Sequence, residues 1–271
     1  MKSNRKNLLK ALGPGILFAS TCIGVSHLVQ STRAGADFGF QLVGFILLAL
    51  VFKYPFFEFG SRYAVATKKS LLEGYLKEGK WVLWVYFVLS LGSMFTVTAA
   101  VTFVTAGMFN NLTGVTLDPA YVSGIILIIC VLILAVGKYS LLDSLLKMIG
   151  AVLLISTLVA FFGALAKGGV TPVSDFIPKE LMDRSSIIFV IALMGWMPTA
   201  VDLSTWNSLW TIERMKQTRY APTLKEVLFD FKFGYIVTAI LALCFLTLGA
   251  NVMYGTGIEL SNNSTVFSDQ V

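Results

Sequence analysis

Long apolar runs separated by short polar segments are the dominant pattern along this chain. A helix needs about 20 predominantly apolar residues to cross the hydrocarbon core of a membrane, so runs of this length predict transmembrane helices. We place seven spans at residues 11–33, 38–59, 81–109, 119–137, 141–166, 185–211 and 233–255. The charged stretches between them, including residues 68–80 and 213–232, are predicted to be linkers.

Two of these spans contain helix-breaking residues near their middle. Span 1 holds "GVSH" at residues 24–27, and span 6 holds "MGWMPTAVD" at residues 194–202. Pro198 removes a backbone hydrogen-bond donor from its helix, and a glycine weakens the helix that contains it. Paired breaks five spans apart are typical of transporters built from two inverted repeats, whose substrate binds where the helices unwind. The pattern therefore predicts a substrate site between the two broken segments.

The same pattern predicts the domain organisation. We expect a single transmembrane domain over residues 1–271, with a first five-helix repeat at about 11–166 and the start of a second repeat at about 185–255. The predicted fold class is an all-α polytopic membrane protein in which helices 1 and 6 are broken.

Composition excludes several classes of function. Hydrophobic residues make up 56% of the chain and charged residues 13%, whereas about a quarter of a soluble domain is charged. The formal net charge of +6 comes from the linkers, and no basic face interleaved with aromatic residues indicates a nucleic-acid partner. The sequence contains no nucleophile–base motif, phosphate loop or cofactor fingerprint, so we predict neither an enzyme nor a cofactor. The predicted partners are membrane lipid and a transported ion or small solute, and the oligomeric state is left open.

The distribution of positive charge predicts the orientation in the membrane. Most of the 21 Lys and Arg residues fall on one side if the N-terminus is cytoplasmic, and the outer segments then hold Arg33, Lys167, Lys179 and Arg184. This asymmetry predicts a cytoplasmic N-terminus, in the plasma (inner) membrane. Lys53 and Lys147 lie within spans, near their predicted cytoplasmic ends, where long side chains can reach the interface.

Several stretches resemble one known family. "LGPGILFAS" and "STRAGADFGFQL" look like the first helix, "KYPFFEFGSRYAVATKKSLLEGY" is similar to the second helix and its loop, and "MGWMPT" is similar to the sixth helix of the natural resistance-associated macrophage protein (Nramp) family of proton-coupled divalent-metal transporters. The resemblance implies the leucine-transporter-type inverted-repeat fold with ten core helices. It also implies that this chain, with about seven helices, is C-terminally truncated and lacks most of the second repeat.

The chain departs from the family at the helix-1 metal motif, which in the family is Asp-Pro-Gly-Asn. Here the Asp position is Gly24 and the Asn position is His27. In helix 6 the family's metal-binding methionine is matched by Met197, and the position three residues earlier, which offers a carbonyl oxygen, is Met194. The family's histidine after the proline is replaced by Thr199. The resemblance therefore implies a metal site that has lost its usual acidic ligand.

One acid could compensate for that loss. Asp202 lies deep in span 6, and an ionisable residue inside a membrane indicates function by default. The candidate substrate-binding residues are Gly24, His27, Met194, Met197, Thr199 and Asp202. Of these, His27, Met197 and Asp202 are the tentative metal ligands, and the His–Met pair is a soft donor set that suits Fe²⁺, Cu or Zn²⁺. The candidates for proton coupling are His27, Asp202 and Glu58, which lies four residues before Arg62.

Three functional hypotheses follow. The first is an Nramp-like secondary transporter that moves a divalent metal ion together with protons through this altered site. The second keeps the fold but carries a small organic solute or another ion, because the family's Asp and Asn are absent. The third is a sensor or scaffold that does not transport.

Overall fold

The computed structural model describes residues 10–257, and all the regular elements in that range are helices. In chain order these are α2 (Pro14–Cys22), the π-helix η1 (Val25–Ser31), α3 (Thr32–Phe38), α4 (Val43–Thr67), α5 (Leu71–Glu78), α6 (Lys80–Thr113), α7 (Pro119–Val136), α8 (Lys138–Lys167), α9 (Arg184–Trp196), α10 (Leu203–Thr218) and α11 (Leu224–Val252). Helices α4, α6, α7, α8 and α11 are long and apolar enough to cross a membrane. The predicted all-α polytopic membrane protein is confirmed.

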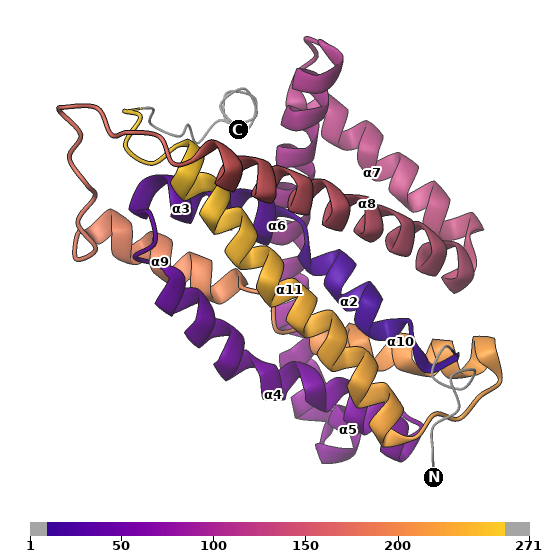
Figure 1. Ribbon diagram of the computed structural model, residues 1–271. Coiled ribbons are helices and arrows are strands. Elements are labelled where there is room, and N and C mark those ends of the chain that lie inside the picture. The colour runs from indigo at the N-terminus through magenta and orange to yellow at the C-terminus, as the bar shows by residue number, and fades with distance from the viewer. Residues whose placement is uncertain (1–9, 258–271) are drawn as a thin grey trace.

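The other two predicted spans are the interrupted ones. Span 1 consists of α2, η1 and α3, with a turn at residues 23–24 between α2 and η1, and span 6 consists of α9 and α10 with residues 197–202 between them. Figure 1 shows the long helix α11 in the middle of the molecule with α2 and α3 of the first interrupted span beside it, while α9 and α10 of the second pack against α4 and helix 1. The breaks in helices 1 and 6 thus occur where the sequence predicts them.

Close backbone packing joins α11 to both halves of the interrupted first span. A Cβ added to Gly15 would lie 2.1 Å from a backbone oxygen of α11, and one added to Gly234 would lie 2.0 Å from Gly15 O. At the other end of the contact, a Cβ on Gly35 would lie 1.9 Å from a backbone oxygen of α11, and one on Gly249 would lie 2.0 Å from a backbone oxygen of α3. Small residues allow helix backbones to approach this closely in membranes. Helix α11 therefore holds α2 and α3 in place on either side of the break.

A buried carboxylate anchors the beginning of α2 to α11. Asp230 accepts hydrogen bonds from the backbone N–H groups of Gly13 (3.1 Å) and Gly15 (2.6 Å). The first N–H groups of a helix have no partner within the helix, and a negative charge there also suits the helix dipole. Asp230, on the neighbouring helix α11, supplies both the hydrogen-bond acceptors and the negative charge. The cap of α2 is therefore also a contact between two helices.

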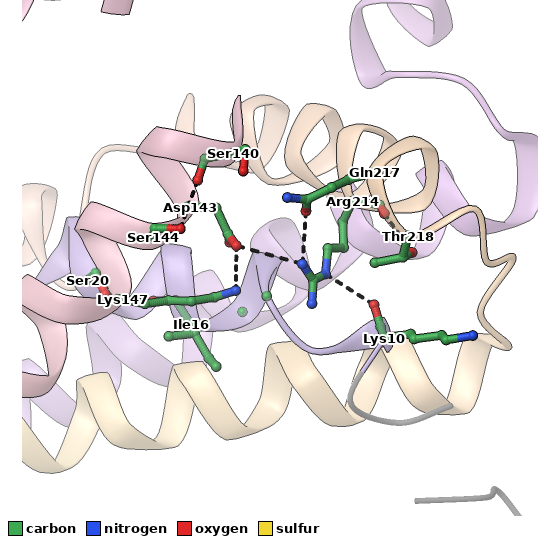
Figure 2. A network of polar contacts seen from close by, with 12 residues as sticks. Lys10, Ile16, Ser20, Ser140, Asp143, Ser144, Lys147, Arg214, Gln217 and Thr218 are labelled. Atoms are coloured by element: carbon green, nitrogen blue, oxygen red, sulfur yellow. Dashed lines mark hydrogen bonds and ion pairs between the residues drawn. The ribbon is translucent and has the colours of Figure 1, made fainter. Parts of the chain in front are cut away.

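A network of ionic contacts lies at the same end of the molecule, as Figure 2 shows. Arg214 of α10 donates from Nε to Lys10 O (3.1 Å), donates from Nη1 to Gln217 Oε1 (2.9 Å), and lies 3.7 Å from Asp143 Oδ2. Lys147 donates to the same carboxylate oxygen at 2.6 Å. The network links α8 and α10 to Lys10, four residues before the start of α2. Within this network Lys147 forms an ordinary ion pair with Asp143.

The hydrophobic core is centred on Phe18 of α2, which is fully buried. Its ring contacts Phe57 (5.1 Å between centroids), Phe231 (5.6 Å) and Tyr235 (5.8 Å). The Tyr235 hydroxyl donates to Leu50 O at 2.6 Å, so its polar end is satisfied within the core. These contacts pack α4 and α11 against α2, which is the first half of helix 1.

Two segments predicted to be linkers are partly helical. Residues 71–78 form α5, and α11 begins at Leu224, well before the predicted start at residue 233. Both starts carry a capping box, in which Ser70 pairs with Glu73 and Thr223 pairs with Glu226. Charged residues hide these helices from a reading based on hydropathy, whereas the Ser/Thr-x-x-Glu spacing would have located both starts.

The outer helices leave their apolar side chains on the surface. None of the most apolar stretch of α6 is buried within the protein, and only 6% of that of α7. Large apolar side chains such as Leu89, Phe95 and Val131 are each more than 60% exposed. Such surfaces belong in lipid or against other membrane helices.

Replacing Gly249 with alanine should prevent normal packing of α11 against α3. The added Cβ would meet a backbone oxygen at 2.0 Å, and a rotamer change cannot relieve this contact. Overpacking of this kind costs about 1–3 kcal/mol or more, which should appear as a lower melting temperature and a lower yield of monodisperse protein in size-exclusion chromatography. Gly163→Ala in α8, where the added Cβ meets nothing within 4 Å, is the matched control. Equal behaviour of the two variants would contradict the packing argument.

Candidate functional site

The first break removes Gly24 from regular helical geometry. Helix α2 ends at Cys22, and the N–H of Gly24 donates to Cys22 O at 2.8 Å instead of continuing the α-helical ladder. The backbone of Gly24 is exposed and faces open space, because the nearest heavy atom to an added Cβ would lie 4.0 Å away. The π-helix η1 then carries the chain onward from Val25. Unwinding therefore exposes backbone at Gly24 in the middle of span 1.

The second break separates α9 from α10. The peptide bond between Met197 and Pro198 is cis, and α10 begins at Leu203. Asp202 occupies the N-cap position of α10 without forming a side-chain capping hydrogen bond, and its carboxylate interacts with the amides of Asp202 and Leu203. The positive end of the α10 dipole favours a negative charge at this position.

A cavity of about 410 Å³ lies between the two breaks and α6. Gly24 and Ser26 line it from helix 1, Thr199 and Asp202 line it from helix 6, and one face of α6 closes it. The lining contains no charged residue other than Asp202. The α6 residues that line it are Tyr86, Ser90, Ser93, Met94, Val97, Thr98 and Val101.

The structure places His27 outside this cavity. The side chain is fully buried, with Nε2 at 3.0 Å from Thr238 O and Nδ1 at 2.9 Å from Ser26 Oγ. A carbonyl oxygen only accepts, so Nε2 donates to Thr238 O, and Nδ1 lies within hydrogen-bonding distance of the Ser26 hydroxyl. Both ring nitrogens are therefore engaged with protein groups, and neither points to a substrate.

Ser26 connects the two breaks directly. Its hydroxyl lies 2.7 Å from Cys22 O and 3.1 Å from Pro198 O, in addition to its contact with His27. One hydroxyl proton thus serves three possible acceptors, two in helix 1 and one in helix 6. Sequence reasoning passed over Ser26, although a hydroxyl inside a helix break is a signal that could have identified it.

The two methionines also lie away from the cavity. Met197 is fully buried in the core cluster around Phe18, and Met194 packs against the same cluster. The structure therefore brings Gly24, Thr199 and Asp202 of the predicted site together. It does not bring His27, Met194 and Met197 to them, and the tentative set of His27, Met197 and Asp202 is not assembled.

Glu58 is likewise remote from the cavity. It is 9% exposed and forms the expected ion pair with Arg62, one turn later on α4. Its role as a proton-coupling residue stays a prediction, and its visible role is this pair.

The donors available to a metal ion are mostly oxygen atoms. Across residues 10–257 no group of three or more His, Cys, Asp or Glu side chains is placed to hold a metal. Around the cavity the side-chain donors are the Asp202 carboxylate, the hydroxyls of Thr199, Ser90 and Ser93, and the thioether of Met94. Oxygen donors thus outnumber sulfur at the cavity, and oxygen suits a hard cation.

Hydroxyl-bearing residues lie on the face of α6 that lines the cavity. Tyr86, Ser90, Ser93 and Val97 recur every three or four residues, which places them on one face of the helix. Hydroxyl groups at this spacing inside a strongly apolar helix are a detectable signal of a lined cavity.

The chain matches a known family over most of its length. A family model described as natural resistance-associated macrophage protein-like matches residues 15–268. An uncharacterized protein of Pasteurella multocida (strain Pm70) is 40% identical over 257 residues, which cover 94% of this chain and 59% of that protein. The chain therefore spans about three fifths of the length of this curated relative.

Cysteine labelling tests which predicted residues face the cavity. Of the native cysteines in the described chain, Cys22 and Cys244 are buried and Cys130 is exposed, so Cys130→Ser provides a quiet background. In that background Thr199→Cys is expected to react with a small water-soluble thiol reagent, whereas His27→Cys and Met197→Cys, at fully buried positions, should react far more slowly. Mass spectrometry measures the extent of labelling. Equal labelling at positions 27 and 199 would contradict the arrangement.

Proposed function

Because the chain belongs to the natural resistance-associated macrophage protein-like family, we propose that it contains the substrate site of a secondary transporter that moves a divalent metal ion across the membrane, coupled to protons. Asp202 is the residue that carries this proposal. It is a half-buried acid between two broken helices, and it supplies the charge of a cavity that is otherwise uncharged. An acid in such a place is costly unless a cation or a proton neutralises it.

The oxygen donors around Asp202 favour a hard cation such as Mn²⁺ or Mg²⁺. Carboxylate, hydroxyl and carbonyl oxygens are the ligands that these ions prefer, and Mg²⁺ commonly keeps several of its waters. A water occupies about 30 Å³ in the liquid, so a cavity of about 410 Å³ has room for an ion that retains part of its hydration shell. A single carboxylate is then sufficient, because water supplies the remaining ligands.

Proton coupling follows from the same carboxylate. A metal ion binds the ionised form of Asp202, so metal binding and protonation compete at this group. His27 holds the break through Thr238 and Ser26, and Glu58, which is paired with Arg62 away from the cavity, is a separate candidate for proton coupling. We place the N-terminus in the cytoplasm and the protein in the plasma (inner) membrane, supported by the asymmetry of Lys and Arg.

A second candidate substrate is a small organic cation. The aromatic rings of Tyr86, Trp196 and Trp206 line the same cavity as Asp202. Aromatic faces together with a carboxylate recognise alkylammonium groups, and a volume of about 410 Å³ lies within the usual range for small-molecule sites.

Asp202→Asn is expected to weaken metal binding. In the detergent-purified protein, Mn²⁺ binding is measured by loss of the free aqueous Mn²⁺ signal in electron paramagnetic resonance. Wild type should bind Mn²⁺ more weakly at low pH, whereas Asp202→Asn should bind at least about tenfold more weakly at all pH values, since loss of a charged ligand exceeds 1.4 kcal/mol. Asp175→Asn, at an exposed loop position, is the matched control.

The other outcomes separate the alternatives. Displacement of bound Mn²⁺ by tetramethylammonium, or binding of tetramethylammonium alone, would favour the organic-cation transporter. Binding without uptake into proteoliposomes would favour a sensor or scaffold. Retention of full Mn²⁺ affinity in Asp202→Asn would rule out the proposed site.

A further inference from the structure

Lys53 is a cationic residue in the middle of a membrane-spanning helix. It is the eleventh residue of α4 (Val43–Thr67), about 15 Å along the axis from the first residue at 1.5 Å per residue. The sequence placed it near the cytoplasmic end of its span, but α4 continues to Thr67, so both helix ends are distant. Lys53 thus lies in the middle of α4 rather than at either of its ends.

The Lys53 ammonium group contacts the helix-6 break. Nζ donates to the backbone oxygen of Gly195 at 2.6 Å. Gly195 is the penultimate residue of α9 (Arg184–Trp196), and the last carbonyl groups of a helix lack partners within the helix. The carbonyl of Leu193 is already used by the N–H of Met197. Lys53 thus caps the C-terminus of the first half of helix 6 from a neighbouring helix.

No carboxylate explains the position of Lys53. Within residues 10–257 it forms no ion pair, whereas Lys147, the other lysine predicted to lie within a span, is paired with Asp143. The nearest acid along α4 is Glu58, which pairs with Arg62. The negative end of the α9 dipole is therefore the interaction that the structure provides for this charge.

The two ends of the helix-6 break carry complementary charges. Lys53 lies at the C-terminal, negative end of α9, and Asp202 lies at the N-terminal, positive end of α10. In broken-helix transporters the C-terminal ends of half-helices and the unwound carbonyls are where Na⁺ or H⁺ is coordinated. At such an end, the ammonium group of a lysine can take the place of a bound ion, because it is a cation attached covalently to the protein.

We propose that Lys53 is a resident cation of the helix-6 break, and that its ammonium group replaces a mobile cation at the C-terminus of α9. The break is then held in its unwound form without Na⁺. This role concerns the geometry of the break, so it is independent of which cation the Asp202 cavity binds.

Chemical rescue of Lys53 variants tests this proposal. Lys53→Ala removes the ammonium group and leaves space for a small cation, and Lys53→Met removes the charge but keeps the apolar stem. In N-methylglucamine chloride both variants should melt about 3–8 °C below wild type, a shift that corresponds to about 2 kcal/mol for a protein of this size. Exchange of N-methylglucamine for Na⁺ or methylammonium at constant ionic strength should restore Lys53→Ala and leave wild type and Lys53→Met unchanged.

A matched lysine and a conservative variant complete the design. Lys167→Ala, at the exposed end of α8, should match wild type in every salt. Lys53→Arg should retain most of the stability, because the guanidinium group still donates to Gly195 O. A Lys53→Ala variant that melts like wild type, or one whose loss no small cation reverses, would overturn the proposal. Retained Mn²⁺ binding in a destabilised Lys53→Ala would separate this result from a failure of the Asp202 site.

Discussion

The close contact of α11 with both halves of helix 1 is the constraint on which the site depends. An unwound segment inside a membrane has lost part of its own hydrogen bonding, so its geometry must be imposed by neighbours. Glycine pairs at Gly15–Gly234 and Gly35–Gly249 bring the backbones together on either side of the break. Between them, Thr238 O accepts a hydrogen bond from His27, and one turn before Gly234 the Asp230 carboxylate caps α2. The break is thus a fixed structural feature supported along its whole length.

Helix 6 is held differently, by charge and by contact with helix 1. Lys53 and Asp202 complement the dipoles of its two halves, and Pro198 O meets the hydroxyl of Ser26. Because Ser26 also contacts His27, a change at the helix-6 break reaches α11 through two side chains. A substrate bound at Asp202 would therefore act on a segment that is held by hydrogen bonds as well as by the packing of Met197 in the core.

The sequence predicted the helices of this fold better than it predicted the directions in which their side chains point. The seven spans and both breaks follow from hydropathy and from the positions of Gly24 and Pro198, since these properties are local. Whether His27 points into the cavity depends on the π-helix η1, which shifts the angular position of each residue relative to an α-helix. The same limitation applies to Met197, whose direction follows the chain path beside Pro198, and to Lys53, whose depth depends on where α4 ends. Spacing along the chain therefore located the site, but three-dimensional contacts were needed to choose its residues.

The two glycine contacts also mark off a segment of α11 and a segment of helix 1 whose lengths differ. On α11 the glycines lie fifteen residues apart, about 22 Å of regular helix, whereas on helix 1 they lie twenty residues apart, about 30 Å if that helix were unbroken. The break and η1 absorb the surplus of about five residues. Helix 1 is thus too long to run straight between its two contacts with α11. A change in the number of residues between these contacts would therefore alter the break, and the candidate cavity beside it, even if every residue lining that cavity were preserved.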